Sequence, residues 1–372
     1  MTLRSCQGAA GTAGSVSTPV MLRSTMRLSI LDQSPIISGH SPAEAIHATL
    51  ELARAAERLG YHRYWLAEHH AMKGLADPCP EILLGQIAAA TVRIRVGTGG
   101  VLLPYYSALK VAEVFRMYEA LFPGRIDLGI GRAPGGTLLT ARALNADALD
   151  GEDRFAVHVQ ETLGYLDDAL PRDYPFHAVK AMPSGPTSPQ VWLLGSSDYS
   201  GSLAAHLGLP FSFAHFISAH GGAAVARAYR RDFRPSYRGS EPYCIAAVFA
   251  ICASTGDKAE RLAASIDLRR LEMARGQEGL IATTEEALAR PYSEAERAVI
   301  ARERARAVIG TPEAVRSGLL QIKEQFEADE LMIITITGDY ESRLRSYELL
   351  AESFGLDGSR VASAAGREPS HS

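Results

Sequence analysis

The stretch Tyr64-Trp-Leu-Ala-Glu-His-His70 is where the interpretation of this chain begins. An apolar run ends abruptly there in one carboxylate and two imidazoles, and a loop of small residues follows. A buried strand that presents acid–base groups at its carboxyl end is how parallel α/β folds build their sites. The histidines are equally well explained as hydrogen-bonded loop residues on this stretch alone. The functional interpretation gains weight because three later strands end in equally reactive or glycine-rich turns.

The composition is that of an ordinary globular protein. The 372 residues are 47% hydrophobic and 22% charged, with a formal net charge of −4. This charge argues against a dedicated nucleic-acid or anionic-membrane surface. No apolar run reaches the roughly 18–20 residues that span a bilayer. The cysteines (Cys6, Cys79, Cys244 and Cys252) are too few for a disulfide framework and lack metal-ligand spacing, so we expect a cytoplasmic protein without a metal.

Short apolar strands alternate with amphipathic helices from residue 27 onward. The sharpest helix signal is at 42–59, where Ser41 is a candidate N-cap, Pro42 is the first helical residue and Gly60 follows the end. We expect a closed (β/α)8 TIM barrel rather than an open doubly wound sheet, because Asp32-Gln-Ser-Pro35 after the first strand is no phosphate-binding turn. The predicted strands are 27–31, 63–67, 94–97, 126–130, 191–194, 211–213, 243–252 and 331–336.

Three segments fall outside this alternation. Residues 1–25 are expected to form a disordered N-terminal arm and residues 358–372 a flexible tail, which leaves 26–357 as a single domain. Between the seventh and eighth predicted strands, a long insertion at about 265–309 is charged and partly helical. We predict that this insertion is a mobile lid over the catalytic face, and the alternative is a solvated peripheral helix pair.

The residues that follow the strands of a barrel line its active face. Ser196, Ser197 and Ser200 open a helix directly after a strand, and Arg132 follows a neighbouring strand, a combination suited to a phosphate. Taken alone, the serines are ordinary helix caps. The pair Gly99-Gly100 at a strand end permits close approach to a flat ligand, or makes a flexible turn.

Motifs along the chain resemble, in order and spacing, those of the bacterial luciferase-like monooxygenases. The resemblance covers about residues 26–356. The forms LDQSP (31–35) and LGSSDY (194–199) favour the single-subunit, alkanal-monooxygenase-like branch. The motifs that carry the resemblance are WLAEHH (65–70), VGTGGVLLP (96–104), GRIDLGIGR (124–132) and GTPE (310–313).

This resemblance implies an enzyme that binds FMNH2 supplied by a separate NAD(P)H:flavin reductase. The family forms a C4a-hydroperoxyflavin with O2 and transfers one oxygen atom to an organic substrate. The resemblance assigns His69 and Glu68 to catalysis, with His69 as an acid–base near its ordinary pKa of about 6.5. It also implies a cis peptide bond between Gly99 and Gly100. The cofactor-binding residues that it implies are Gly99, Gly100, Gly131, Arg132, Gly195, Ser196, Ser197 and Ser200.

The substrate is less well defined by the sequence. The branch suggests a secondary metabolite such as a polyketide, hence a role in antibiotic biosynthesis. Two alternatives remain open: an F420-dependent hydride-transfer oxidoreductase and a non-catalytic flavin-binding partner subunit. The helices predicted at 80–90 and 107–121 contain the apolar stretches 82–90 and 111–121, which favour a homodimer. The residues expected to line the substrate pocket are His70, Tyr105, Tyr106, Phe213 and His215.

Overall fold

The computed structural model describes residues 26–132, 135–146, 152–218 and 221–358. Eight parallel strands close into a barrel in the order β1-β2-β3-β4-β5-β6-β7-β9, and β9 pairs back to β1. This arrangement confirms the predicted TIM barrel; the predicted arm and most of the predicted tail lie outside the described residues. The barrel strands are β1 (Arg27–Asp32), β2 (Arg63–Leu66), β3 (Arg95–Leu102), β4 (Ile126–Gly131), β5 (Gln190–Gly195), β6 (Phe211–Ala214), β7 (Cys244–Cys252) and β9 (Glu330–Ile334).

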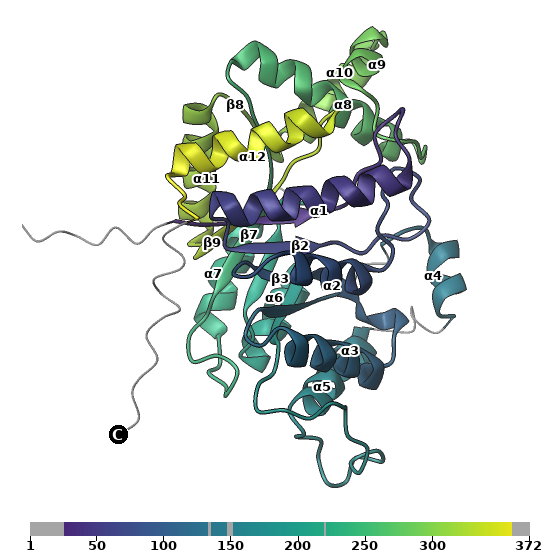
Figure 1. Ribbon diagram of the computed structural model, residues 1–372, viewed down its shortest axis with the longest axis vertical. Coiled ribbons are helices and arrows are strands. Elements are labelled where there is room, and N and C mark those ends of the chain that lie inside the picture. The colour runs from purple at the N-terminus through teal and green to yellow at the C-terminus, as the bar shows by residue number, and fades with distance from the viewer. Residues whose placement is uncertain (1–25, 133–134, 147–151, 219–220, 359–372) are drawn as a thin grey trace, which may run out of the picture.

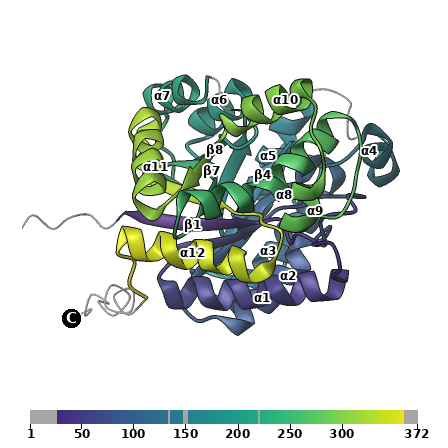
Figure 2. The same ribbon diagram turned by 90° about the horizontal axis from the view of Figure 1, so that it is seen from above.

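Helices cover the outside of the barrel, and α1 lies alongside α12 in both views (Figures 1 and 2). The predicted start of α1 is confirmed: the Ser41 hydroxyl and the Glu44 carboxylate form a capping box, and Gly60 ends the helix at φ 88°. No helix in the described part of the chain is long and apolar enough to cross a membrane. The helices are α1 (Pro42–Leu59), α2 (Pro80–Ala90), the 3-10 turn η1 (Leu103–Tyr105), α3 (Ala108–Leu121), α4 (Leu138–Leu144), α5 (Glu152–Leu166), α6 (Asp198–Leu207), α7 (Gly222–Asp232), α8 (Gly256–Ala274), α9 (Thr284–Ala289), α10 (Glu294–Arg304), α11 (Pro312–Phe326) and α12 (Tyr340–Phe354).

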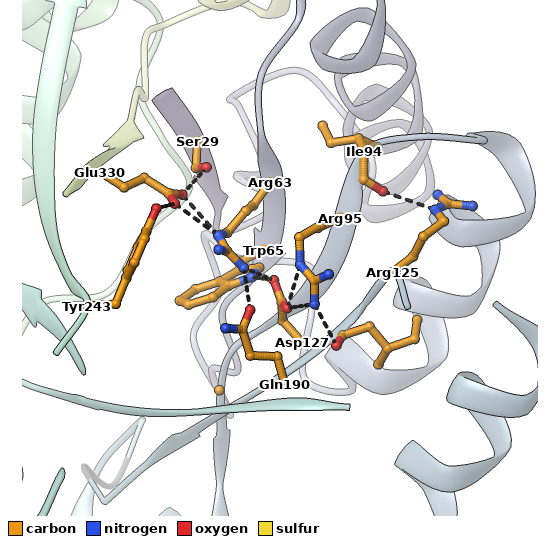
Figure 3. Close-up of polar contacts among 12 residues, drawn as sticks. Ser29, Arg63, Trp65, Ile94, Arg95, Arg125, Asp127, Gln190, Tyr243 and Glu330 are labelled. Atoms are coloured by element: carbon orange, nitrogen blue, oxygen red, sulfur yellow. Dashed lines mark hydrogen bonds and ion pairs between the residues drawn. The ribbon is translucent and has the colours of Figure 1, made fainter. Parts of the chain in front are cut away.

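A buried polar network occupies the barrel interior near the amino ends of the strands (Figure 3). Arg63 Nη1 lies 2.7 Å from Asp127 Oδ2, and Arg63 Nε lies 3.1 Å from Glu330 Oε1. The indole Nε1 of Trp65 donates to the same Asp127 oxygen at 2.9 Å, and its ring packs edge-on against Trp192. Because these charges are paired and hydrogen-bonded, they can be buried in the barrel interior at the amino ends of the strands. The interior space for a ligand is therefore at the carboxyl ends of the strands.

The insertion between the seventh and eighth barrel strands has a different construction from the one predicted. Ser265 lies inside α8, so the insertion does not begin in a loop. After α10, the strand β8 (Ala307–Gly310), which the sequence analysis did not predict, pairs in parallel with the end of β7 outside the closed barrel. Figure 1 shows α8, α9 and α10 gathered at one end of the molecule.

The insertion is also joined to the loop that follows β1. Ile281 forms a bridge with Ile37, in which the Ile281 N–H donates to the Ile36 carbonyl at 2.9 Å and the Ser38 N–H donates to the Ile281 carbonyl at 2.7 Å. These hydrogen bonds tie the segment to the barrel in this state. The movement of the segment as a lid stays a prediction.

Candidate active site

A cavity opens at the carboxyl ends of the barrel strands. Its volume is about 230 Å³, and the empty space that includes the opening to solvent is about 990 Å³. Every predicted catalytic and cofactor-binding residue lies in its wall. The lining residues are Leu31, Gln33, Trp65, Ala67, Glu68, His69, Gly99, Gly100, Leu102, Gly131, Arg132, Gly135, Leu194, Gly195, Ser196, Ser197, Ser200, Ser212, Ala214, Phe216, Ile217, Ala247 and Met332.

Glu68 is buried directly after β2, and both of its carboxylate oxygens are engaged by protein groups. Oε2 accepts the backbone N–H of Leu102 at 3.0 Å, while Oε1 accepts the Tyr106 hydroxyl at 2.8 Å and lies 2.7 Å from His70 Nε2. Burial raises the pKa of Glu68, and the hydrogen bonds from these three groups partly offset the effect. The carboxylate thus connects the end of β2 to the end of β3.

His69 lies in the cavity wall and has a strongly altered acidity. Burial, followed by the positive charge of Arg269 and that of His70, lowers the pKa of His69 to about 4. The prediction of an imidazole that titrates near neutral pH is therefore corrected: at pH 7 this ring is neutral. Its Nδ1 is buried and has no hydrogen-bond partner among the residues that the structure describes.

Glycines in β3 and β4 shape one side of the cavity. The peptide bond between Gly99 and Gly100 is cis, as the resemblance implied, and the register between β3 and β4 shifts between Thr98 and Val101. A Cβ at Gly100 would lie 2.4 Å from Leu194 Cδ1, whereas a Cβ at Gly131 would meet nothing closer than 3.5 Å. Backbone thus forms the cavity wall at Gly99–Gly100, and open space remains beside Gly131.

The part of the cavity wall after β4 and β5 has the groups of an anion site. Ser197 is the N-cap of α6, and its hydroxyl makes no capping hydrogen bond. The Ser200 hydroxyl is buried against Gly195, where a Cβ would lie 2.4 Å from Ser200 Oγ. The Arg132 guanidinium lies 4.4 Å from the centroid of the Tyr199 ring. A cation, hydroxyls and helix N–H groups therefore share one wall, which suits a phosphate.

The five residues predicted for the substrate pocket lie outside this cavity wall. Phe213 is fully buried and packs on Phe326 with ring centroids 5.4 Å apart, and the His215 ring lies 5.5 Å from that same phenylalanine. His70 and Tyr106 contact Glu68 from behind the cavity, and the Tyr105 ring meets His70 edge-on at 5.9 Å. These side chains therefore support the wall and do not form its surface.

The sequence analysis missed the residues that do line the cavity at β6. Successive side chains of a strand point to opposite faces. Because Phe213 faces the helices, Ser212 and Ala214 face the barrel interior and line the cavity. The signal was present in the alternating pattern of β6, but a strand of four residues does not reveal which face is inside. Gln33, which follows β1, was also missed.

The chain matches one protein-family model over most of its described length. The model is described as luciferase-like monooxygenase and matches residues 26–329. The Bacillus subtilis protein YceB is 45% identical over 329 residues, which are 88% of this chain and 99% of YceB. The N-acetyl-S-alkylcysteine monooxygenase of Bacillus subtilis is 36% identical over 331 residues, which are 88% of this chain and 98% of that protein.

The comparison with solved structures agrees with the sequence comparison. The crystal structure of apo-MsnO8 is 40% identical in sequence to this chain and matches its fold with a TM-score of 0.82. The match covers 89% of this chain and 98% of the MsnO8 chain. Family model, relatives and solved structure therefore all extend over most of the chain rather than over an isolated motif; the family model ends at residue 329, directly before β9.

Proposed function

The chain belongs to the luciferase-like monooxygenase family, and we propose that it is the oxygenase component of a two-component system that uses FMNH2 and O2. When bound, the reduced flavin supplies the two electrons by which one atom of O2 is reduced to water while the other enters the organic substrate. A separate NAD(P)H:flavin reductase would deliver the flavin. The observation that carries this proposal is the convergence of Arg132, the serines of α6, Gly99–Gly100 and His69 on one cavity.

We assign the ends of the flavin from the chemistry of the two walls. Arg132, Ser197 and Ser200 would hold the phosphate, with Gly195 and Ser196 beside them, because charge-assisted hydrogen bonds and helix N–H groups favour a dianion. The isoalloxazine would lie against the backbone of Gly99 and Gly100, where a Cβ has no room. Gly131 leaves space next to that surface.

The remaining residues of the wall would control protons and water. His69 is neutral at pH 7 and can accept a proton through Nδ1. Glu68 would be a positioning residue, because its carboxylate accepts the N–H of Leu102 and so fixes the end of β3. Apolar side chains around the cavity (Leu31, Trp65, Leu102, Leu194 and Met332) would exclude water from the reacting centre.

The substrate is a small organic molecule whose class remains a proposal. One relative is named for N-acetyl-S-alkylcysteine, a thioether that carries a free carboxylate, which makes an N-acylated amino-acid thioether the first substrate to try. A secondary metabolite such as a polyketide, with a role in antibiotic biosynthesis, is the other class that the sequence suggested. Both classes fit an oxygenase that accepts a flexible, partly apolar molecule.

The test is flavin binding without oxygen, measured by calorimetry. We expect FMNH2 to bind and stabilise the protein, and Arg132→Ala to weaken FMNH2 about tenfold to a hundredfold while reduced riboflavin is unaffected, since only FMN carries the phosphate. Arg142→Ala removes an exposed arginine of α4 outside the cavity wall and serves as the control. Product formation with a generic reductase and NADH then tests turnover.

Two results would contradict the proposed function, and a third would contradict the assignment of Arg132. Protection by reduced F420 and not by FMNH2 would indicate hydride transfer without O2. Flavin binding without any oxygen consumption would indicate a non-catalytic flavin-binding subunit. An equal loss of FMNH2 and riboflavin affinity in Arg132→Ala would remove that residue from the phosphate site.

A further inference from the structure

We propose that Trp65, Trp192 and Tyr243 form an electron-transfer chain from the cavity at the carboxyl ends of the strands to their amino ends. This inference rests on the proposed function, because the oxidants that the chain would remove arise from O2 chemistry in that cavity. Its task would be protection: an electron from Tyr243 reaches a one-electron oxidant before that oxidant attacks the cavity wall. This activity is additional to oxygenation.

The two tryptophans of the sequence meet inside the barrel. Trp65 belongs to β2 and Trp192 to β5, and their ring centroids lie 5.3 Å apart in an edge-on arrangement. Tyr243 directly precedes β7, and its ring packs edge-on against Trp192 with the centroids 5.6 Å apart. Three aromatic rings from separate parts of the chain are therefore in continuous contact.

Trp65 is the end of this electron-transfer chain at the cavity. Its side chain lines the cavity and lies against Gly99, where a Cβ would be 3.2 Å from both Cβ and Cε3 of Trp65. The isoalloxazine is assigned to the backbone of Gly99 and Gly100, so a bound flavin would lie next to the indole. Indole and phenol rings lose an electron more easily than aliphatic side chains. Trp65 is therefore placed to reduce an oxidant in the cavity.

Tyr243 is the half-buried end of the electron-transfer chain, and Figure 3 shows its hydroxyl next to the Glu330 carboxylate. The hydroxyl donates to Glu330 Oε2 at 2.9 Å and accepts from Arg27 Nη1 at 2.9 Å. A phenol that loses an electron becomes a strong acid, so Glu330 would take its proton and leave a neutral radical. Because that radical carries no charge, nearby guanidinium groups do not oppose it. Tyr243 can therefore hold the oxidising equivalent.

Trp192 lies between the two ends and is suited to passing the oxidising equivalent on. Its Nε1 is buried and has no hydrogen-bond partner among the described residues, so an oxidised Trp192 could not release its proton. The Arg63 guanidinium, 4.6 Å from the ring centroid, opposes a positive charge there. Packing alone does not require this unpaired N–H, because a phenylalanine would fill an apolar core without one. A redox role explains why such a group is retained.

The charges and electrons of the proposed reaction balance. One electron moves from Tyr243 through Trp192 and Trp65 to the oxidant, for example a hydroxyl radical, which becomes hydroxide. The proton of the Tyr243 hydroxyl moves to Glu330. A soluble thiolate then gives one electron to the tyrosyl radical and becomes a thiyl radical, while Tyr243 takes its proton back from Glu330. The oxidising equivalent thus leaves the cavity, and the protein returns to its starting state.

The test uses the full-length protein with oxidised FMN bound and a flash of blue light in the absence of O2. Light turns the flavin into a one-electron oxidant, which takes the place of the hydroxyl radical. In wild type we expect rapid quenching of the flavin fluorescence, followed by the optical and electron paramagnetic resonance signals of a neutral tyrosyl radical. Trp65→Phe should lengthen the fluorescence lifetime of the flavin, because the direct electron donor is removed.

Tyr243→Phe removes only a half-buried hydroxyl, so it should keep the quenching and lose the tyrosyl signal. Trp192→Phe should give the same result, because it interrupts the electron-transfer chain between its ends. The matched control is Tyr61→Phe, which removes a buried hydroxyl elsewhere and should keep both signals.

The proposal is overturned if wild type gives no tyrosyl signal, if Tyr243→Phe or Trp192→Phe keeps an undiminished one, if Trp65→Phe leaves the lifetime unchanged, or if the control loses the signal. Calorimetry of FMN binding separates this proposal from the proposed function. FMN bound without a tyrosyl radical would overturn the electron-transfer chain alone. Failure of the flavin to bind, oxidised or reduced, would overturn both.

Discussion

Two neighbouring side chains after β2, Glu68 and His69, show how burial acts differently on an acid and a base. Three protein groups hydrogen-bond the carboxylate of Glu68. The imidazole of His69 has the charge of Arg269 nearby and an Nδ1 without a partner in the described structure. Glu68 is therefore suited to holding the backbone in place. His69 is suited to accepting a proton from a bound molecule.

His69→Ala tests this difference through the pH dependence of stability. The folded pKa of His69, about 4, lies below the value of about 6.5 expected for the unfolded chain. The unfolded state therefore binds more protons between these pH values, and wild type loses stability as the pH falls through that window. At pH 5 the free energy of unfolding of wild type should therefore be about 1–2 kcal/mol lower than at neutral pH because of His69, and His69→Ala should not show this loss.

Urea denaturation at pH 7.5 and pH 5 measures the effect, with the exposed His206→Ala on α6 as the control. Parallel losses of stability in wild type and His69→Ala would contradict the shifted pKa. The same variant should bind FMNH2 normally and release a larger share of the consumed O2 as H2O2. Unchanged coupling in an oxygen-electrode assay would remove His69 from the reaction.

At the scale of the element, β3 is constrained at Gly100 by residues of β4 and β5. A Cβ at Gly100 would approach Leu194 Cδ1 to 2.4 Å and the Gly129 carbonyl oxygen to 2.7 Å. One of these neighbours is backbone, so it cannot move away at low cost. At Gly131 the nearest atom would be Leu102 Cδ2 at 3.5 Å, which is ordinary contact.

We therefore expect Gly100→Ala to lower the free energy of unfolding by about 1–3 kcal/mol, the range for an overpacked interior. Gly131→Ala is the matched control, and it should change stability by less than about 0.5 kcal/mol. Chemical denaturation of both variants gives the comparison. Equal stability of the two would show that β3 shifts to accommodate the methyl group.

For the whole molecule, the barrel closes its amino-terminal end with paired charges and leaves its carboxyl end for the cavity. The outer face of α2 and α3 is different in character. Ile82, Met117 and Leu121 are at least half exposed there, and an apolar surface of this kind is typical of a protein interface. We propose, as the sequence analysis predicted, that two copies of the chain pair through this face.

Met117→Glu combined with Leu121→Glu should convert such a dimer into a monomer, because association would bury two unpaired carboxylates. Sedimentation velocity measures the change. The control is Leu139→Glu, which changes a leucine of another helix, α4, that is 79% exposed. A wild-type protein that sediments as a monomer at every concentration would contradict the proposal.

Much of this molecule could be predicted from its order of residues. Strands and helices alternate with signals that are local: the Ser41 cap, the apolar run that ends at Glu68, and the serines that open α6. Because these signals depend on neighbours along the chain, the eight barrel strands and the one face that collects Arg132, Ser197 and His69 follow from them. The motif resemblance added the cis bond at Gly99–Gly100, which the structure contains.

Other features depended on contacts between residues far apart in the chain. The tertiary structure decided that Ser212 rather than Phe213 faces the cavity, that β8 forms at all, and that the pKa of His69 falls to about 4. Burial, electrostatic fields and cavity walls arise only when separate segments pack together. A local sequence pattern determines which elements form, and their packing determines the environment of each side chain.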